Sequence, residues 1–293
     1  DRCQIAFDVK LKYFFIVFFF AFVTSATGQI SQPTAWTKAY DTNSTLTYTG
    51  VNFAIAGGSN RVLVVAIAST FTDAGGSGTQ ADPTVITYGG VTLTKAIGNG
   101  GTDGRMHTWL YYLKDNVIMD GTSRPLNVTG GAVSGSTLAN MTVWYSVYAG
   151  VDQTPATYTT GNGFDNNTPN NATANLSSMM AVNTGEQAIY ISSIYNDNSG
   201  TIPSYTIKSG WNSGGNTTAS FSTGNVVSWK NEVVNRSIPT SNTTDDAETS
   251  RLTPNGNIRY AMSAISLPGG PTISSLGSTN GCVGSTITIN GTK

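Results

Sequence analysis

The chain has 293 residues, of which 39% are hydrophobic and only 11% are charged, with a formal net charge of −1. This hydrophobic fraction excludes an intrinsically disordered chain, and the singly scattered Lys and Arg residues exclude nucleic-acid binding, which needs a basic stripe. Thr, Ser, Asn and Gly fill the place of the missing charges, and these residues favour strands and turns over helix interiors. The composition therefore predicts an all-β fold.

An export signal is the first predicted element, at 1–28. Two lysines precede an unbroken apolar run at 13–23, and small, weakly polar residues follow at 24–28. This order is typical of a secretory signal peptide, and the run is too short to span a bilayer as a stable helix. Cleavage after Gly28 would leave a secreted or cell-surface protein whose mature chain has no membrane span. Residues 1–8 fit no part of a signal and are interpreted as sequence upstream of the true start or as a longer n-region.

The two cysteines predict no covalent cross-link through sulfur. Cys3 lies in the predicted signal, so Cys282 is alone in the mature segment. Neither an internal disulfide nor a cysteine-based metal site is then expected. Stability must come from the core and from the hydrogen-bonded sheets.

Strands are predicted at regular spacing after a short lead-in at 29–41. The stretch 61–69 (RVLVVAIAS) is apolar on both faces, which is typical of a strand between two layers. Two β-branched runs within 84–96 meet at Gly89-Gly90, a pair that can adopt the positive φ of a tight hairpin turn. Further strands are expected at 45–55, 106–113, 125–129, 141–149, 188–195, 205–211, 226–233 and 258–267.

Side-chain alternation assigns the faces of the strand at 141–149. One face carries Met141, Val143, Tyr145 and Val147, and the other carries Trp144 and Tyr148. The polar stretches 154–173 and 235–249 are predicted to be loops. The residues 269–271 (GGP) form the clearest domain boundary in the chain.

The two halves of the strand series are similar in pattern. RVLVVAIAS at 61–69 aligns with AIYISSIYN at 188–196, VTLTKAI at 91–97 with YTIKSGW at 205–211, and MTVWYSVYAG at 141–150 with IRYAMSAISL at 258–267. The match could indicate two binding modules, but any sandwich contains such strands. We therefore predict one antiparallel two-sheet β-sandwich, jelly-roll-like, over 29–268, with each half contributing to both sheets.

Residues 271–292 (PTISSLGSTNGCVGSTITINGT) resemble the opening of an IPT/TIG domain, an immunoglobulin-like fold. The resemblance is carried by a Pro-x-Ile start, a Gly-x-x-Gly turn and an alternating strand, formed by Pro271, Ile273, Gly281, Gly284, Ile287, Thr288, Ile289 and Gly291. The usual second proline of the family is missing, and Cys282 lies inside the turn. The resemblance implies that 269–293 is the truncated start of an Ig-like domain, so we expect a longer protein.

Residues 45–267 are similar to a poorly characterised β-sandwich module of secreted bacterial and phage-tail-like proteins. The motifs that carry the similarity are RVLVVAIA, VITYGGVTLT, WLYYLKD and YAGVDQ. The similarity implies a large modular surface protein with further repeats and a C-terminal sorting segment beyond Lys293. It implies no catalytic residues.

Catalysis has few candidate residues in this sequence. The single histidine, His107, falls on the same strand face as Trp109 and Tyr111, which predicts a packed aromatic face rather than a catalytic site, and no Gly-x-Ser-x-Gly elbow is present. A glycosidase needs two carboxylates across a cleft. Glu232, in the strand-like WKNEVV, is the least unreasonable acid, but an exposed strand residue explains it equally well. We predict that the chain is not an enzyme.

Two kinds of ligand remain as alternatives. Sugars stack on aromatic rings and bind Asn and Asp side chains, a combination offered by Trp211 beside Asn212 and, separately, by Phe164-Asp165-Asn166. Aromatic residues of β proteins are nevertheless more often core residues. Oxygen ligands for a structural calcium ion, the one cofactor considered, are offered by Asp197, Asp245, Asp246 and Glu248, although none of these turns has EF-hand spacing.

The function predicted from the sequence is a non-enzymatic, secreted or cell-surface module for adhesion or structural spacing in a larger multidomain protein. The alternative is a carbohydrate-binding, lectin-like module attached to an enzyme beyond this fragment. The expected partner is an extracellular glycan or a surface protein.

Overall fold

The computed structural model of the chain describes residues 30–42, 45–71, 79–100, 105–134, 137–169, 173–175, 180–197, 205–207, 210–223, 225–236, 243–245, 248–251, 257–270, 272–276 and 289–292. The regular secondary structure of these residues is strand throughout, with no helix, so the predicted all-β class is confirmed. No helix long and apolar enough to cross a membrane occurs among them. Residues Ile30–Gly269 form one compact unit, and the last two strands belong to a second unit.

The first half of the large unit forms a complete jelly roll. Its strands are β1 (Ser31–Thr42), β2 (Thr47–Ala54), β3 (Val62–Phe71), β4 (Thr79–Gln80), β5 (Val85–Tyr88), β6 (Val91–Thr92), β7 (Thr94–Gly100), β8 (Met106–Lys114), β9 (Ser123–Thr129), β10 (Val133–Ser134) and β11 (Leu138–Ala149). The antiparallel pairs are nested, with β1 beside β11, β2 beside β9, β3 beside β8 and β5 beside β6. This nesting is the jelly-roll arrangement that the sequence predicted.

The nested pairs of the first half are divided between two sheets. The first inner sheet has the order β1-β11-β3-β8-β7, and the first outer sheet has the order β2-β9-β5-β6. The predicted hairpin is confirmed, because β5 and β6 meet at Gly89 and Gly90, whose φ angles are 57° and 83°. A side chain at either position would be strained in this turn.

The second half repeats this plan. Its strands are β12 (Thr159–Pro169), β13 (Thr173–Asn175), β14 (Met180–Val182), β15 (Gln187–Asp197), β16 (Tyr205–Ile207), β17 (Trp211–Thr223), β18 (Asn225–Arg236), β19 (Thr243–Asp245), β20 (Glu248–Arg251) and β21 (Asn257–Leu267). The second inner sheet has the order β12-β21-β15-β18-β17, which matches the first inner sheet strand for strand. The outer layer of the second half consists of two small sheets, one of three strands in the order β13-β20-β16 and one of two strands, β14-β19.

Residue registers show that the halves are equivalent in detail. Val62 pairs with Tyr148 in the first half, and Ile189 pairs with Ile265 in the second. These four residues are equivalent in two of the three alignments made from the sequence, so those two alignments are in register. The alignment of 91–97 with 205–211 is wrong. The residues of β8 that pair with β7 have equivalents in β18, and those equivalents pair with residues of β17 that lie beyond 211.

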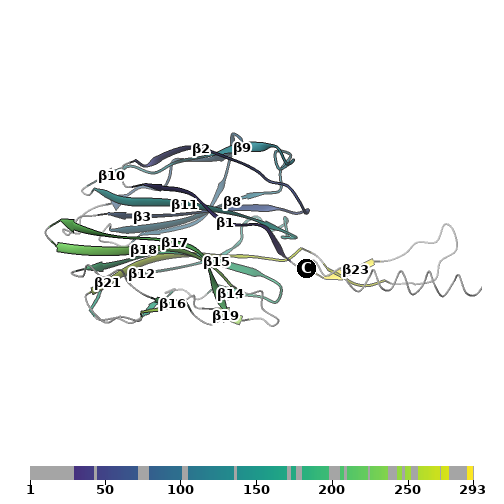
Figure 1. Cartoon of the computed structure of the whole chain (residues 1–293). Helices are drawn as coiled ribbons and strands as arrows, with labels where there is room; N and C mark the ends of the chain where they lie inside the picture. Colours follow the sequence, from purple (N-terminus) through teal and green to yellow (C-terminus); the bar gives the residue numbers. More distant parts are fainter. Residues whose placement is uncertain are drawn as a thin grey trace, which may run out of the picture. The chain divides into compact units, whose positions relative to one another are not determined.

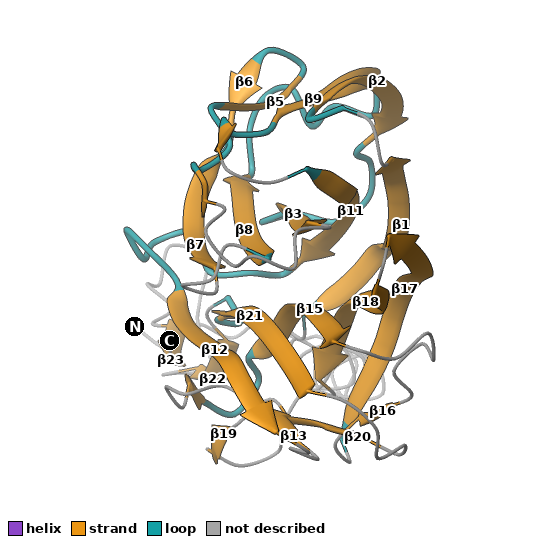
Figure 2. Cartoon of the chain, turned by 90° about the vertical axis from the view of Figure 1, so that its left-hand side faces the viewer, coloured by secondary structure: helices purple, strands orange, loops and turns teal. Residues whose placement is uncertain are grey.

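The prediction that each half contributes to both sheets of a single sandwich is wrong. Each half builds its own sandwich, and the two inner sheets then pack against each other, which gives four layers (Figures 1 and 2). The sequence pattern did not decide this point because a strand that is apolar on both faces fits either arrangement. Partner choice in a sheet is a long-range contact that side-chain periodicity does not specify.

Strand β3 shows why its sequence is apolar on both faces. Leu63, Val65 and Ile67 face the core between the first inner and outer sheets, whereas the alternate residues Val62 and Val64 face the second half. The face assignment of β11 is confirmed in the same way, since Val143 and Tyr145 belong to the first core and Trp144 belongs to the contact between the halves. A side-chain period of two therefore specifies two different cores along one strand.

The contact between the two inner sheets, called here the inter-half interface, combines an apolar cluster with buried polar bonds. Trp144 and Tyr148 pack with Ile189, Ile191 and Val233 in the cluster. Buried hydrogen bonds cross beside it, joining Asn231 Nδ2 to Asn140 Oδ1 (3.1 Å), Thr70 Oγ1 to Asn231 Oδ1 (3.3 Å), Thr70 Oγ1 to Ser193 Oγ (3.1 Å) and Thr108 Oγ1 to Ser263 Oγ (2.9 Å). Directional bonds between buried groups specify one register of the two sheets.

Three segments predicted to lack strands contain strands in the structure. The lead-in contains β1, and the predicted loop at 154–173 contains β12. Both are edge strands of the inner sheets, paired on one side only, so their polar sequences lack the apolar alternation of the central strands. The predicted loop at 235–249 also contains β19 and the start of β20.

All four edge strands of the inner sheets carry a break in register. The breaks occur between Lys38 and Tyr40 in β1, between Lys95 and Ile97 in β7, between Asp165 and Thr168 in β12, and between Ser213 and Gly215 in β17. Such bulges bend and twist an edge strand.

The second unit contains a single described strand pair. Strand β22 (Thr272–Leu276) pairs antiparallel with β23 (Ile289–Thr292), and Leu276 lies opposite Ile289. Residues 277–288, which contain the whole Gly-x-x-Gly turn, lie outside the described residues. The IPT/TIG resemblance stays a prediction.

Candidate functional site

His107 lies in β8 as part of a packed aromatic face, as predicted. Its ring stacks on Trp109, with centroids 5.5 Å apart and an interplanar angle of 10°, and meets the edge of Phe71 at 6.0 Å. The histidine is 8% exposed. Gly98 makes room for this stack, because a Cβ there would come within 2.2 Å of Trp109 Cδ1. The surroundings of His107 are those of a structural side chain.

Asp82 lies at the rim of this aromatic face and is held by two donors. Trp109 Nε1 donates to Asp82 Oδ1 (2.8 Å), and Lys95 Nζ donates to Asp82 Oδ2. Partial burial acts to raise the pKa of Asp82, but the hydrogen bonds from Lys95 and Trp109 and the charge of Lys95 outweigh it, so the pKa lies below its ordinary value. The carboxylate therefore anchors the indole ring in its charged form.

Replacing Asp82 with Asn should lower the stability near neutral pH and have no effect in strong acid. A depressed folded-state pKa stabilises the fold above the ordinary value of 3.8, and this contribution disappears as the pH falls through the folded-state pKa. The loss should be at most about 1 kcal/mol, because the Asp82 side chain is 55% exposed. Urea midpoints measured across this pH range would test it, and an equal loss in acid and at neutrality would contradict it.

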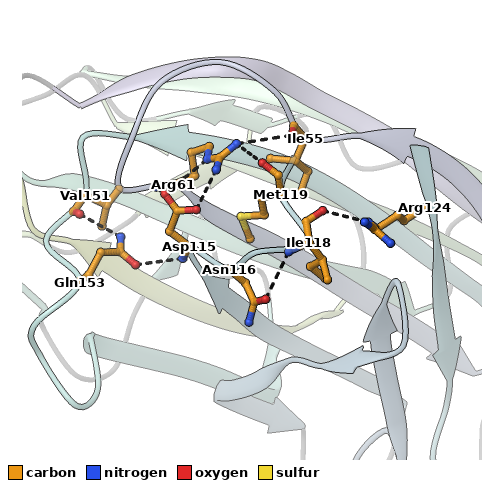
Figure 3. A network of polar contacts seen from close by, with 9 residues as sticks. All are labelled: Ile55, Arg61, Asp115, Asn116, Ile118, Met119, Arg124, Val151 and Gln153. Carbon is orange, nitrogen blue, oxygen red and sulfur yellow. Dashed lines mark hydrogen bonds and ion pairs between the residues drawn. The ribbon is translucent and has the colours of Figure 1, made fainter. Parts of the chain in front are cut away.

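A network of polar contacts centres on Arg61 and Asp115 (Figure 3). Arg61 Nη2 lies 2.9 Å from Asp115 Oδ1, and the backbone N–H of Arg61 donates to Asp115 Oδ2 at 3.1 Å. The guanidinium also donates to the carbonyl oxygens of Ile55 and Met119. One cation thus ties together the loops that follow β2 and β8, and we call this group the Arg61 latch.

The linker between the halves joins the same site. Gln153 accepts a hydrogen bond from the backbone N–H of Asp115 (3.0 Å) and donates to the carbonyl of Val151 (2.9 Å). Lys114 Nζ donates to the Gln153 carbonyl (3.1 Å), and the backbone N–H of Asp152 donates to the Pro268 carbonyl in the second half (2.8 Å). The linker is therefore bonded to both jelly rolls.

The two predicted glycan sites lie on opposite edges of the second inner sheet, and the ring of one of them is buried. Trp211 is 5% exposed, and its ring packs on Tyr190 at 4.9 Å inside the second sandwich, so it cannot offer its face to a sugar and its predicted role is corrected here. Phe164 is 41% exposed in β12, the strand that also contains Asp165 and Asn166. Strands β12 and β17 are opposite edges of a five-stranded sheet, roughly 19 Å apart at the usual strand spacing. The exposed Asn212, beside Trp211, is therefore far from Phe164.

The predicted calcium ligands belong to separate elements. Asp197 ends β15 in the second inner sheet, Asp245 lies in β19, and Glu248 begins β20. Asp246 lies outside the described residues. Within the part of the chain that the structure describes, no three His, Cys, Asp or Glu side chains form a group suited to a metal ion. The calcium ion stays a prediction without a described site.

A buried ion pair between Lys230 and Glu232 is the site that the sequence did not reveal. The exposed-strand interpretation of Glu232 is wrong, because this residue is 2% exposed. Lys230 Nζ lies 2.7 Å from Glu232 Oε2, and Ser213 Oγ donates to Glu232 Oε1 at 2.8 Å. The sequence WKNEVV alternates, but alternation cannot show which face is covered when a strand lies between two layers.

Comparison of the chain with models of protein families, with curated proteins and with solved structures gave no match.

Proposed function

We propose that the mature protein is a non-enzymatic, extracellular module that acts as a rigid spacer within a larger surface protein. The observation that supports this proposal is the way in which the two jelly rolls are fixed to each other. They share the apolar cluster of the inter-half interface, the buried hydrogen bonds beside it, and a linker that is bonded to both halves. Tandem domains joined by an unbonded linker would move relative to each other, so these contacts favour a load-bearing unit of constant length.

The charged groups of the Arg61 latch and of the Asp82 site hold structure together, which also supports a spacer. The Arg61 latch holds loops, and Asp82 holds an indole ring. The histidine that a catalytic triad would need stacks on Trp109 and makes an edge contact with Phe71. These contacts explain the polar residues without invoking a reaction.

Native-state hydrogen exchange of the mature protein tests the rigid-spacer part. If the jelly rolls form one cooperative unit, the slowest amides of β3 and β15 should open with the same free energy and the same denaturant dependence. Asn231→Ala should separate the two values, because it removes the partner of Asn140 and Thr70 across the interface. Unequal opening free energies in the unaltered protein would contradict the proposal.

Fractionation of the producing cells tests the extracellular part. The protein should be recovered at the cell surface or in the medium, with a mature N-terminus at or near Gln29. Recovery from the cytoplasm with the leader intact would contradict this part alone. A glycan array probed with the same material would decide between spacing and the carbohydrate-binding alternative, because specific binding to any glycan would favour the alternative.

A further inference from the structure

The two jelly rolls are related by an approximate internal two-fold axis. The edge strands β1 and β7 of the first inner sheet have β12 and β17 as their equivalents in the second. Across the inter-half interface, β1 packs on β17 and β7 packs on β12 (Figure 2). In the same way, β3 contacts β18 and β8 contacts β15. Each of these contacts thus recurs with the equivalent elements exchanged, which is the arrangement of a two-fold dimer interface.

The side chains on the two sides of this axis differ in size. On one side, Trp144 lies against β17, where a Cβ on Gly215 would be 3.4 Å from Trp144 Nε1. Strand register gives Ala261 as the equivalent of Trp144 and Thr94 as the equivalent of Gly215. A large ring and a glycine on one side of the axis therefore correspond to an alanine and a threonine on the other.

This difference in size favours one pairing of the jelly rolls over the others. Two first halves would bring the ring of Trp144 to the position of Thr94, where the present interface has only a glycine. Two second halves would bring Ala261 to the position of Gly215 and leave the volume of the indole unfilled. Overpacking and cavities are both destabilising. A first half therefore fits a second half better than either fits a copy of itself.

The buried hydrogen bonds of the interface give the same preference. Asn231 Nδ2 donates to Asn140 Oδ1 (3.1 Å), and Thr70 Oγ1 donates to Asn231 Oδ1 (3.3 Å). The equivalent of Asn231 in the first half is Leu110. Two first halves would set a leucine at the place of the amide that bonds Asn140 and Thr70 here. Because buried polar groups that lose their bonds destabilise a complex, this pairing is disfavoured.

We propose that the inner-sheet face of the first jelly roll is a specific binding surface for the second jelly roll, supplied by the same chain or by a second copy. Within one chain the linker keeps the effective concentration of the partner high, on the order of millimolar. The closed monomer therefore predominates in dilute solution, and two chains that have both opened pair reciprocally into a closed dimer. The linker provides proximity, whereas the interface provides recognition. The inference goes beyond the spacing role and does not depend on the location of the protein.

Cutting the linker tests whether recognition needs the covalent connection. A protease site inserted between Ala156 and Thr157, which are both exposed, allows the folded full-length protein to be cleaved between its halves. The two fragments should stay together at micromolar concentration, elute from a size-exclusion column with the uncut protein, and form one-to-one complexes in native mass spectrometry. Fragments that elute separately, or complexes of two first halves, would overturn the proposal.

The outcome is separable from the spacer proposal. If the cleaved fragments part while hydrogen exchange of the uncut protein still shows one cooperative unit, only the binding surface is refuted.

Exchange between copies tests the second chain as a partner. Cleaved protein with an affinity tag on its first half is mixed with isotope-labelled cleaved protein, at a urea concentration just below the unfolding transition that speeds dissociation. The tagged first half should retain labelled and unlabelled second halves in proportion to their amounts. Retention of unlabelled second halves alone would show that the surface does not accept a second copy.

Variants at the interface test its shape. A Cβ on Gly214 would come within 2.5 Å of Trp36 Cδ1, so Gly214→Val should raise the dissociation constant of the cleaved fragments by about tenfold or more. Adding Trp36→Ala removes the colliding ring and should restore part of the affinity, which keeps the test valid if the single variant fails to fold. Thr49→Val, at an exposed position of the first outer sheet, is the control and should leave the affinity unchanged.

Discussion

Replacing Trp144 with Ala should lower the free energy of unfolding by about 3–5 kcal/mol, the usual cost of removing a fully buried large aromatic ring. Trp144 is 1% exposed at the centre of β11. Its ring lies against the second jelly roll, since a Cβ on Gly215 would be 3.4 Å from Trp144 Nε1. The substitution therefore opens a cavity in the inter-half interface rather than within either sandwich. Urea denaturation followed by circular dichroism would measure the loss.

Val117→Ala is the control for this experiment, because Val117 is 89% exposed in the loop after β8. It should change the stability by less than about 0.5 kcal/mol. A loss below about 1 kcal/mol for Trp144→Ala would show that the two halves do not depend on each other for stability. That result would also weaken the proposed role as a rigid spacer.

Replacing Arg61 with Met should cost about 2–3 kcal/mol. The substitution leaves Asp115 without its cation and removes the donors to the Ile55 and Met119 carbonyls. Removing one partner of a buried ion pair costs about 3–5 kcal/mol, and the smaller value reflects side chains that are 17% and 26% exposed. The loss should be visible as a lower urea midpoint at unchanged slope.

The exposed ion pair of Lys38 and Asp41 provides the comparison for the Arg61 latch. Its side chains are 44% and 28% exposed, so Lys38→Met should cost less than about 1 kcal/mol. Equal losses for Arg61→Met and Lys38→Met would mean that the latch is an ordinary surface pair. Faster proteolysis within the linker at 152–157 would be a second sign that the latch had opened.

The sequence was sufficient to predict the strands in which the type of side chain distinguishes one face from the other. Alternation along β11 placed Val143 and Trp144 on opposite faces, and each face proved to belong to a different core. The glycine pair 89–90 located a hairpin, because few other residues adopt its backbone angles. These features depend on residues that are close together in the sequence, so they can be predicted from the sequence alone.

The edge strands and the division into two sandwiches could not be predicted in this way. Strand β12 is polar and contains two glycines and a proline, and its strand form depends on pairing with β21. The partners of a strand are set by contacts far apart in the sequence, which a periodic pattern does not identify.

The predicted site residues failed for a related reason. Trp211 is a residue type that often stacks on sugars, but its ring packs on Tyr190, which belongs to β15 of the second inner sheet. Glu232 was the one acid singled out within a strand, and its burial depends on a core built from other strands. Burial is a property of the assembled layers, so residue type alone could not give it.

The register breaks in the four edge strands of the inner sheets have a consequence for crowding. A straight, flat edge exposes a row of unsatisfied N–H and C=O groups that a neighbouring molecule can extend into a continuous sheet. A bulged edge does not match a second copy of itself over more than a few residues. Molecules displayed side by side at high density would therefore remain separate, and fibre formation through strand addition would be suppressed without a covering helix or a high net charge.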